Sequence, residues 1–484
     1  MARSPDIVDH DSALAYLFGR IDYERADRFP SGSHGLSLDR MRELAFRLGD
    51  PHRRFPVVHV AGTKGKGSTS GMIAAVLTAS GYRTGLYTSP HVDCVEERMQ
   101  IDGRRCGADE FVDLIRRIRP VVDALDGEYE VRGEGRPGPT YFEITTAAAL
   151  LHFVRHQVEV AVLEVGLGGR LDSTNICQPE VAVITSISFD HMRQLGNTLA
   201  LIAGEKAGII KPGVPVVTGV TEPESLDVIR QTALRHDCEC YRAGRHFDHR
   251  YGGTHPPTWE SASPAVWPHG WSEFDYWEDT ASGRYELEGL RTGLLGRHQA
   301  ANAAVAVATL GRLRERGWRA EEAAIREGLL RVDMPARTEV LQRRPMVILD
   351  AAHNVASARA LIDVIRETCP RTAAGRRILV FAASQDKDVA AMLRLLLAEF
   401  DVAILTRFLN NPRAADPDVL LQIAEQIAAD KGGDSCRLIT RDNSTEAWDL
   451  ARSLAADDDV ICVAGSFFLA SELRSLIPQQ FQNP

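Results

Sequence analysis

Segments rich in β-branched residues alternate with helix-like segments along most of the chain, and this alternation limits the possible folds more than any other feature. FPVVHVAG at residues 55–62 is typical of a buried strand, STSGMIAAVLTASG at 68–81 of a helix, and RTGLYTS at 83–89 of the next strand. Further strand-like segments lie at residues 158–166, 180–188 and 214–220, with a helix-like segment at 198–210. Strands alternating with helices predict βαβ units. The expected fold is therefore α/β with a parallel sheet.

A second alternating set begins near Pro335, which disfavours continuation of the preceding helix. Its strand-like segments lie at residues 346–354, 376–384, 401–408 and 459–467. Because 484 residues exceed one ordinary hydrophobic core, two domains are expected. We predict a large parallel-sheet domain over residues 1–334 and a smaller, Rossmann-like α/β domain over residues 335–484.

The alternation breaks between about residues 244 and 291. This stretch holds four of the six tryptophans, which are Trp259, Trp267, Trp271 and Trp277. We interpret it as an irregular or antiparallel insertion whose tryptophans pack at the surface rather than stack on a ligand.

Composition excludes several classes of protein. The chain has 56 basic and 66 acidic residues, and its net charge of −10 argues against a nucleic-acid-binding surface. No apolar run approaches the roughly 20 residues that span a bilayer, and no secretory signal is visible, so we expect a cytoplasmic protein without a membrane partner. Cys238 and Cys240 precede His246 and His249, but the spacing matches no common zinc finger and we expect no metal there.

A glycine-rich turn separates the first strand from the first helix of the large domain, in HVAGTKGKGS at residues 59–68. Gly62, Gly65 and Gly67 permit close backbone approach, and the amides at the helix start face an anion. Lys66 can neutralise phosphate charge, while the Ser68 hydroxyl can cap the helix or meet Mg²⁺. The spacing is shorter than in the common phosphate loop, G-x-x-x-x-G-K-[ST]. We still predict a phosphate site, and hence a large domain of the P-loop ATPase type.

Three further residues stand at strand ends, where a phosphate site that uses ATP would need Mg²⁺ ligands. These are Ser89 in YTSPH, Glu164 in VLEVGLGGR and His191 in SFDHM. Glu164 has apolar neighbours, so burial of its carboxylate would be costly unless it were paired or bound to metal. Each residue taken alone could equally be a helix cap or a buried hydrogen-bonding group.

These segments belong to an ordered series of motifs that together resemble one family. The series is HVAGTKGKGS, YTSPHV, ERMQIDG, TYFEITTAAAL, LEVGLGGRLDSTN, SFDHMRQLGNT, IAGEKAGIIKPGVPVV, GRHQAANAAVA, MPARTEV and LDAAHN. It resembles the folylpolyglutamate synthase and dihydrofolate synthase family, within the Mur-ligase superfamily. The resemblance covers residues from about 35 to 470, apart from the tryptophan-rich insertion, and EVGLGGRLDSTN and EKAGIIKPG are its most distinctive segments.

The resemblance implies a role for each matching position. The implied ATP contacts are Gly62, Thr63, Lys64, Gly65, Lys66, Gly67, Ser68, Asn302, Arg337, Asp350 and His353. The implied magnesium ligands are Ser89, Glu164 and His191, and the implied pterin contacts are Thr140, Tyr141, Phe142, Glu143, Leu171, Asp172 and Ser173. Asp172 is suited to accept hydrogen bonds from the pterin's amino and ring N–H groups.

Lys206 in GEKAGI matches a lysine that is often carbamylated in this superfamily. A carbamate would be an anionic oxygen ligand near Mg²⁺, whereas an ammonium would repel the metal. The chain departs from the family pattern at Ala336 in MPAR and Ala351 in DAAHN, where glycine is usual, so the backbone angles there are expected to differ.

The implied reaction is ATP-dependent amide formation, and the implied cofactors are ATP and Mg²⁺. The residues with implied catalytic roles are Lys66, His191 and Lys206. A pterin carboxylate attacks the γ-phosphate, and the amine of L-glutamate then attacks the acyl phosphate. Its partners are small molecules, namely L-glutamate and dihydropteroate or a reduced folate, and we expect a monomer. ATP is expected at the interface of the two domains, whose closure would exclude water.

Two other functions stay open on the sequence alone. A Mur-type ligase of peptidoglycan precursors would share the loop, although only about 56 residues precede it here. A P-loop nucleotide switch without ligase activity would leave Glu164, His191 and Lys206 without a purpose. The choice between dihydropteroate and tetrahydrofolate, the glutamate contacts and the purpose of the insertion are not determined by the sequence.

Overall fold

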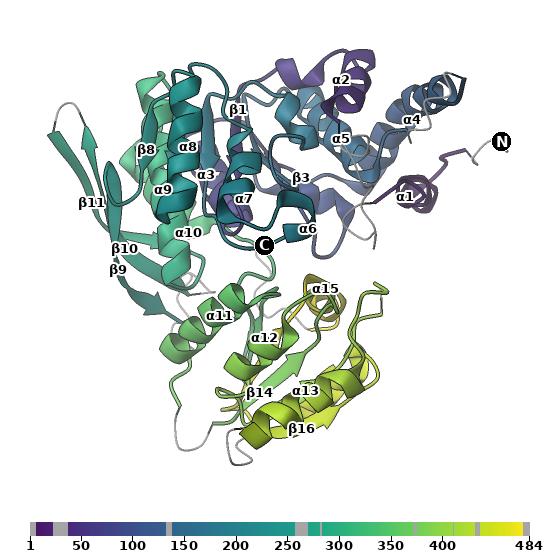
Figure 1. Cartoon of the computed structure of the whole chain (residues 1–484), viewed down its shortest axis with the longest axis vertical. Helices are drawn as coiled ribbons and strands as arrows, with labels where there is room; N and C mark the ends of the chain where they lie inside the picture. The colour runs from purple at the N-terminus through teal and green to yellow at the C-terminus, as the bar shows by residue number, and fades with distance from the viewer. Residues whose placement is uncertain are drawn as a thin grey trace. The chain divides into compact units, whose positions relative to one another are not determined.

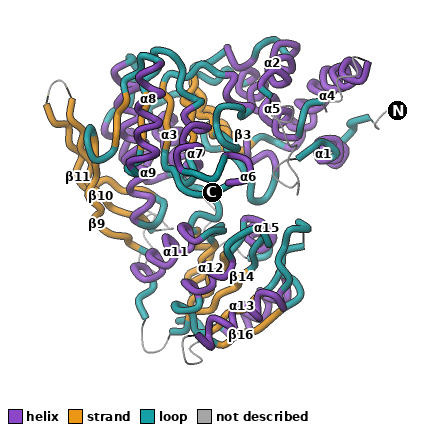
Figure 2. Tube along the Cα trace, in the orientation of Figure 1, coloured by secondary structure: helices purple, strands orange, loops and turns teal. Residues whose placement is uncertain are grey.

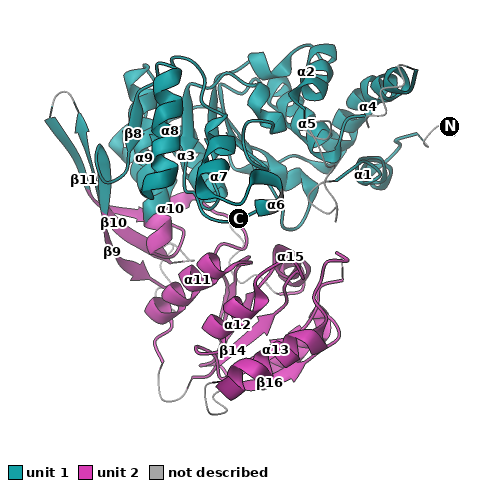
Figure 3. Cartoon of the chain, viewed as in Figure 1, with its two compact units in different colours: residues 1–249, 276–287, 301–329 teal, residues 250–275, 288–300, 330–484 magenta. Residues whose placement is uncertain are grey.

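The computed structural model describes residues 6–22, 37–131, 138–256, 270–280, 283–371, 375–409, 411–430 and 436–477. The chain forms two compact units (Figure 3). The first comprises residues 1–249, 276–287 and 301–329, and the second comprises residues 250–275, 288–300 and 330–484. The two domains expected on either side of residues 334 and 335 stay a prediction.

An eight-stranded sheet forms the centre of the first unit (Figures 1 and 2). Its strand order is β4-β3-β2-β5-β1-β6-β7-β8. The six strands from β2 to β8 in this order are parallel, whereas β3 and β4 extend the sheet in antiparallel fashion. The strands are β1 (Val57–Ala61), β2 (Thr84–Tyr87), β3 (Met99–Ile101), β4 (Arg104–Arg105), β5 (Val160–Glu164), β6 (Val181–Ile184), β7 (Val216–Thr218) and β8 (Cys240–Arg242). The predicted α/β fold with a parallel sheet is confirmed.

Helices flank this sheet and connect its strands. They are α1 (His10–Phe18), α2 (Leu38–Arg47), α3 (Lys66–Ala79), α4 (Ala108–Val131), α5 (Tyr141–Arg155), α6 (Met192–Leu195), α7 (Leu199–Ala207) and α8 (Pro223–Arg235). Short 3-10 turns are η1 (Pro51–Arg53), η2 (Val95–Arg98) and η3 (Ser173–Ile176). Every residue of β1, β5 and β6 is buried, which shows that both faces of the sheet's centre are covered.

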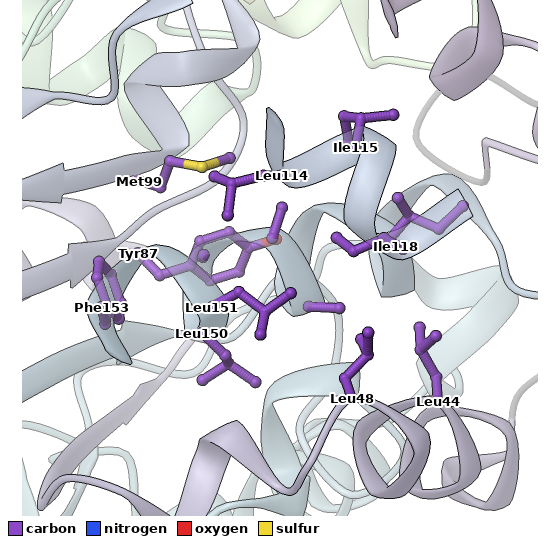
Figure 4. Close-up of a cluster of buried hydrophobic side chains, with 14 of the residues drawn as sticks. Leu44, Leu48, Tyr87, Met99, Leu114, Ile115, Ile118, Leu150, Leu151 and Phe153 are labelled. Atoms are coloured by element: carbon purple, nitrogen blue, oxygen red, sulfur yellow. The ribbon is translucent and has the colours of Figure 1, made fainter. Parts of the chain in front are cut away.

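Apolar clusters stabilise the first unit, and two of them lie among its described residues. The larger one joins side chains of α1, α2, α4 and α5 to β2 and β3, and Figure 4 shows part of it. Tyr87, Leu114, Ile118 and Phe153 are among its members. A second cluster packs residues around β6 and β7, including Ile184 and Val216, against α7 and α8. Apolar burial of this kind stabilises by roughly 25 cal/mol per Å² of buried surface.

A separate three-stranded sheet occupies much of the predicted insertion. It contains β9 (Phe247–His255), β10 (Trp271–Thr280) and β11 (Gly283–Thr292) in the order β11-β10-β9. Trp271 stacks on His255, and the Arg291 guanidinium lies 5.3 Å from the Trp271 ring centroid. Both contacts are packing within the sheet. Trp259 and Trp267 lie outside the described residues.

The second unit contains a six-stranded α/β sheet of order β12-β13-β17-β14-β15-β16. Only β12 is antiparallel to its neighbour. The strands are β12 (Glu339–Arg343), β13 (Met346–Leu349), β14 (Arg377–Phe381), β15 (Val402–Leu405), β16 (Arg437–Thr440) and β17 (Val460–Ala464). Two helices that follow β11 in the chain, α9 (Arg297–Glu315) and α10 (Glu322–Arg331), lie mostly in the first unit. The later helices belong to the second unit and are α11 (Val355–Thr368), α12 (Val389–Leu396), α13 (Pro417–Asp430), α14 (Ser444–Leu454) and α15 (Phe467–Arg474).

Within the described ranges, no helix is both long and apolar enough to cross a membrane. All eight cysteines are free thiols.

Candidate active site

The loops after four neighbouring strands bring the predicted site residues of the first unit to one edge of the sheet. β1 lies between β5 and β6, and β2 lies on the other side of β5. Because these strands are parallel, their carboxyl ends share one edge, which is where α/β proteins bind ligands. Glu164 ends β5, Ser89 follows β2, His191 lies beyond β6, and the phosphate loop, residues 62–68, follows β1.

Two glycines of the phosphate loop stand where a side chain would not fit. A Cβ at Gly62, whose φ is +154°, would lie 1.9 Å from the Thr185 Oγ1. A Cβ at Gly65, whose φ is +81°, would lie 2.2 Å from the Asn302 Oδ1. The loop therefore approaches its neighbours more closely than any other residue type allows. Asn302, a predicted ATP contact on α9, is brought to the loop by this packing.

The loop after β6 braces the phosphate loop through short hydrogen bonds. The Thr63 amide donates to the Ser186 carbonyl at 2.7 Å, and the Lys64 amide donates to the Ser186 hydroxyl at 2.9 Å. The Thr185 hydroxyl donates to the Lys64 carbonyl at 2.7 Å. The Lys64 ammonium forms an ion pair with Asp190 at 2.7 Å. These contacts hold the turn in place.

The two lysines of the loop differ in their surroundings. The Lys64 ammonium is paired with Asp190, whereas the Lys66 ammonium makes no hydrogen bond or ion pair within the described part of the chain. Lys66 is also the first residue of α3, and the N-cap residue Gly65 provides no side chain to cap the first-turn amides. Free amides and a cation at a helix start are what an anionic phosphate requires.

Lys206 is buried beside the phosphate loop. Its residue is 4% exposed, and its Nζ donates to the Gly62 carbonyl at 2.8 Å. Burial, followed by the charge of Lys66, lowers the pKa of Lys206 well below its ordinary value, although Asp190 opposes this shift. A neutral amine is the form that reacts with CO₂, so the environment suits the predicted carbamylation.

The structure joins two of the three predicted magnesium ligands. The Ser89 amide donates to the Glu164 Oε2 at 3.1 Å, and Glu164 is 3% exposed. A hydroxyl and a buried carboxylate are oxygen donors of the kind Mg²⁺ prefers, so this pair fits the metal. His191 lies in a turn with φ +49°, its side chain is half-exposed, and its Nε2 is 3.9 Å from the Asp190 Oδ1.

The Asp172 carboxylate is engaged within its own loop. Its Oδ2 accepts the Gly166 and Leu167 amides at 3.0 Å, and its Oδ1 accepts the amide and hydroxyl of Thr174 at 3.0 and 2.5 Å. These four donors occupy the acceptor positions of one carboxylate. Burial raises the pKa of Asp172 despite the hydrogen bonds from Thr174. This geometry favours a role in shaping the loop that carries Leu171 and Ser173.

The TYFE segment begins α5 and shows a similar structural use of its polar residues. Thr140 is the N-cap, and Glu143 completes a capping box with it. The Arg40 Nε donates to the Glu143 Oε2 at 2.7 Å, and both side chains are buried. Tyr141 is buried under the Arg98 guanidinium, which lies 5.1 Å from its ring centroid. Phe142 lies against Gly166, where a Cβ would meet its ring at 2.4 Å.

Arg337, Asp350 and His353 lie together in one region of the second unit. The Asp350 Oδ2 accepts the amide and hydroxyl of Thr338 at 2.7 and 2.9 Å, and its Oδ1 accepts the Ala352 amide at 2.7 Å. Burial raises the pKa of Asp350, and the charge of Arg337 acts in the opposite direction. The His353 Nδ1 lies 2.9 Å from the Ala351 carbonyl oxygen.

The two alanines that replace family glycines are neighbours. The Ala351 amide donates to the Ala336 carbonyl at 2.9 Å. Ala336 has φ +54°, so it adopts the left-handed conformation that glycine takes readily, and its side chain is fully buried. A left-handed conformation at this position is thus compatible with alanine.

Among the described residues, the group of side chains that could hold a metal ion does not include Cys238, Cys240, His246 or His249. Cys238 instead lies 3.1 Å from the Lys211 carbonyl oxygen.

Comparison with known proteins decides the family. The model of the Mur ligase middle domain matches residues 133–310, and that of the Mur ligase glutamate ligase domain matches residues 336–467. The "Dihydrofolate synthase/folylpolyglutamate synthase" of Bacillus subtilis is 38% identical over 83% of this chain and 91% of its own length. The protein of the same name from Mycobacterium tuberculosis is 34% identical over 97% of this chain and 96% of its own. The chain belongs to the folylpolyglutamate synthase and dihydrofolate synthase family.

Solved structures of this family share the fold. The Mycobacterium tuberculosis folylpolyglutamate synthase complexed with ADP and AMPPCP is 32% identical, with a TM-score of 0.80 over 98% of this chain and all of that one. Escherichia coli FolC in complex with DHPP and ADP is 30% identical, with a TM-score of 0.77 over 98% of this chain and 99% of that one. As a member of the family, the chain is an ATP-dependent acid–amino-acid ligase of folate metabolism, and this is favoured over a peptidoglycan ligase or a nucleotide switch.

Sequence reasoning missed the residues that support this ligase site. Thr185, Ser186 and Asp190 lie more than 120 positions after Lys64, the loop residue that each of them contacts. Their one signal is polar residues directly after a buried strand, in the segment TSISFD.

Proposed function

We propose that the enzyme joins L-glutamate to the carboxylate of a pterin substrate, and that it accepts both dihydropteroate and reduced folates. The observation that carries the proposal is Lys66, a cation without a hydrogen bond or ion pair in the described residues, at the uncapped start of α3 and near the buried Lys206. The acceptance of both pterins is supported by the relatives in Bacillus subtilis and Mycobacterium tuberculosis, whose names carry both activities.

The proposed reaction has two steps. The pterin carboxylate attacks the γ-phosphorus of ATP, which forms an acyl phosphate and releases ADP. The neutral amine of glutamate then attacks the acyl carbon, and inorganic phosphate leaves. Lys66 and the amides of the phosphate loop stabilise the charge on the transferring phosphoryl group.

Ser89, Glu164 and His191 are proposed to hold Mg²⁺. The ion would supply positive charge to the phosphate oxygens when bound. The pairing of the Ser89 backbone with the buried Glu164 carboxylate supports this assignment, because it already places two oxygen-bearing side chains at one sheet edge.

Lys206 is proposed to be carbamylated in the active enzyme. Its buried amine has a lowered pKa, so the neutral nucleophile needed for reaction with CO₂ is favoured. Addition of the amine to the CO₂ carbon, with loss of one proton to solvent, gives an anionic carbamate. The positive charges of Lys64 and Lys66 would stabilise that anion.

The remaining contacts are proposed from the matching motifs. Asn302, Arg337, Asp350 and His353 are assigned to ATP. Thr140 to Glu143 and Leu171 to Ser173 are assigned to the pterin, with Asp172 acting through the loop it orders. We also propose a monomer that works in the cytoplasm, which the eight free thiols support.

The test is a ligation assay with purified enzyme, ATP, glutamate and each pterin in turn, scored by the mass of the glutamylated product. We expect product from dihydropteroate and from tetrahydrofolate. Lys66→Ala should abolish ligation, while the control Lys387→Ala, which removes a lysine of the second unit, should not. ADP release that ignores glutamate would reject the ligase in favour of a nucleotide switch. Activity restricted to a UDP-linked peptidoglycan precursor would reject the pterin substrate.

A further inference from the structure

A cysteine, a glutamate and two histidines meet where α4 packs on α5, and the proposed reaction uses none of them. Cys106 precedes α4, and Glu110 lies in its first turn. His152 lies in the last turn of α5, and His156 is the C-cap of that helix. The Cys106 Sγ, a Glu110 carboxylate oxygen and a His152 ring nitrogen all lie within 4.8 Å of one another.

Both histidines already face the same carboxylate. The His152 Nδ1 lies 2.9 Å from the Glu110 Oε1, and the His156 Nε2 lies 2.8 Å from the same oxygen and 3.0 Å from Oε2. The spacing of four residues places the two imidazoles on one face of the helix, as in helical zinc sites. The Cys106, Glu110 and His152 side chains thus converge on one point, and His156 joins them through its contact with Glu110.

Hydrogen bonds to Glu110 explain the positions of the two histidines, but they do not explain why a thiol is buried beside them. Cys106 is 2% exposed, and its Sγ lies 3.5 Å from the Gly107 carbonyl oxygen, which is a weak contact. His152 is buried as well, whereas the His156 side chain is 44% exposed and opens the cluster to solvent. Buried ligands with one exposed histidine form a site that an ion can enter.

The charges near the cluster are mainly negative, which favours binding of a cation. The Glu96 residue is 4% exposed; its Oε1 pairs with the His10 ring, and its Oε2 has no hydrogen-bond partner within the described ranges. Glu110 and Glu96 both place negative charge near the Cys106 side chain. Arg155 is the opposing charge, with its Nε 3.8 Å from the Glu110 Oε1, but its side chain is 53% exposed and can turn away into solvent.

We propose that Cys106, Glu110, His152 and His156 form a binding site for a divalent transition metal of the zinc type. Thiolate, imidazole and carboxylate are the ligands that Zn²⁺ takes, and four of them complete a tetrahedral structural site. Ligand atoms of such a site lie about 3.3–3.6 Å apart because the bonds are about 2.0–2.3 Å long. The ligand atoms of Cys106, Glu110 and His152 lie within 4.8 Å of one another, so each pair needs to approach by at most about 1–1.5 Å, and the exposed His156 side chain must turn toward them.

Binding exchanges one set of bonds for another. The S–H bond of Cys106 breaks as the sulfur–metal bond forms, and its proton passes to solvent. The imidazole nitrogens of His152 and His156 bind as neutral donors and give up their hydrogen bonds to Glu110. No oxidant or reductant is needed.

The position of the site indicates a structural role. His152 lies 12 residues after Thr140, which is about 18 Å along an α-helix with a rise of 1.5 Å per residue. The metal would therefore clip α4 to α5 at the end of α5 opposite the proposed pterin contacts. It is expected to stabilise the first unit without taking part in ligation.

Cobalt titration tests the site directly. Full-length protein, freed of metals with a chelator, is titrated with Co²⁺ in excess Mg²⁺, which occupies the proposed nucleotide-linked metal site. We expect a thiolate-to-cobalt charge-transfer absorption that saturates at one equivalent and is lost on addition of Zn²⁺. Cys106→Ser should remove this absorption, and His152→Ala should weaken cobalt binding by about tenfold or more. The control Cys238→Ser should leave both unchanged.

A second measurement guards against misfolded variants. Zn²⁺ should raise the Tm of the wild-type protein but not that of Cys106→Ser or Glu110→Gln, while both variants should keep ligase activity with Mg²⁺. Glu110→Gln retains a hydrogen-bonding group beside both histidines and lacks the charge. Absence of the absorption in the wild type would overturn the proposal. So would its loss in Cys238→Ser together with retention in Cys106→Ser, or a full zinc-induced Tm shift in Glu110→Gln.

Discussion

The phosphate loop of the first unit and the Ala336–Thr338 turn of the second unit both contain backbone with positive φ, but they achieve it with different residues. Gly62 has φ +154° and a neighbouring hydroxyl at 1.9 Å from where its Cβ would lie. Ala336 and Thr338 have φ +54° and +53° and carry side chains. In the first loop, glycine is needed because a side chain would not fit. The second turn needs only a left-handed backbone conformation, which residues other than glycine adopt at an energetic cost.

Hydrogen bonds maintain the less favourable conformation in the second turn. The Ala336 amide donates to the Glu339 Oε2 at 2.9 Å, and Arg474 forms an ion pair with Glu339. Asp350 accepts both polar groups of Thr338. Strained backbone persists where its surroundings over-determine it, and these contacts do so here. The two regions thus differ in how a substitution should affect them.

The largest effect is expected from Gly62→Ala. The new methyl group would collide with Thr185 and with the Ser186 amide, 3.2 Å away, so the loop must move. Ligation should fall below detection, and the free energy of unfolding should decrease by about 2–6 kcal/mol. Gly81→Ala is the matched control, because Gly81 also has positive φ, +90°, but nothing lies within 4 Å of its Cβ position. Equal losses in ligation for the two variants would show that space is not the reason for glycine.

The next largest effect is expected in the pH dependence of the free energy of unfolding, which should differ between a buried histidine of the first unit and a histidine of the second unit. Burial lowers the pKa of His59, in β1 directly before the phosphate loop, from 6.5 to about 3. Because the folded pKa lies below the unfolded one, its contribution to stability is full above pH 6.5 and is lost as the pH falls toward 3. The loss attributable to His59 should reach about 4–5 kcal/mol at pH 3.

His298 in the second unit provides the comparison for that titration. Burial and then the charge of Arg337 lower its pKa to about 4, but the residue is only partly buried, so solvent screening reduces the effect. We expect a loss of about 2 kcal/mol. Chemical denaturation of His59→Gln and His298→Gln between pH 7 and 4 measures both terms. Between pH 7 and 4, the free energy of unfolding should change less with pH in His59→Gln than in His298→Gln. The opposite order would contradict this assignment.

Asp350→Ala should have an intermediate effect on the second unit. It removes the acceptor of three hydrogen bonds that hold Thr338 and Ala352. The raised pKa of Asp350 shows that burial offsets part of this stabilisation, so we expect a loss of about 2 kcal/mol. Urea unfolding monitors the change, with Asp350→Asn as the conservative control. An unchanged urea midpoint in Asp350→Ala would show that the carboxylate does not stabilise the turn.

The smallest effect is expected from Ala336→Gly, and it has the opposite sign. Glycine relieves about 1–2 kcal/mol of left-handed strain but gains unfolded-state entropy worth about 0.4–1 kcal/mol. The net stabilisation should be about 0.5–1 kcal/mol in urea unfolding. A destabilised Ala336→Gly would mean that the buried methyl group, rather than the backbone conformation, determines the residue at this position.

The sequence was sufficient for the features that depend on neighbouring residues. Apolar runs predicted the strands β1, β5 and β6, and the strand–turn–helix order predicted the phosphate loop. The family followed from motifs that are continuous in the chain. Each strand, turn and single motif is encoded by neighbouring residues, where periodicity and turn chemistry act directly.

Features that depend on distant residues were beyond the sequence. Lys64 and Lys66 look alike in the loop, and only the position of Asp190 separates the paired lysine from the one at the helix start. Likewise, the capping box and ion pair of Glu143 and the internal hydrogen bonds of Asp172 give structural uses to residues that family position assigns to the pterin. Strand order brings such groups together, and local patterns do not encode strand order.

The fate of oxygen tests most directly the claim that the phosphate loop activates a carboxylate. A pterin substrate labelled with ¹⁸O in its carboxylate is converted with ATP and glutamate, and the released phosphate is analysed by mass spectrometry. Acyl-phosphate formation predicts one labelled oxygen in each phosphate. Unlabelled phosphate formed together with glutamylated product would contradict it.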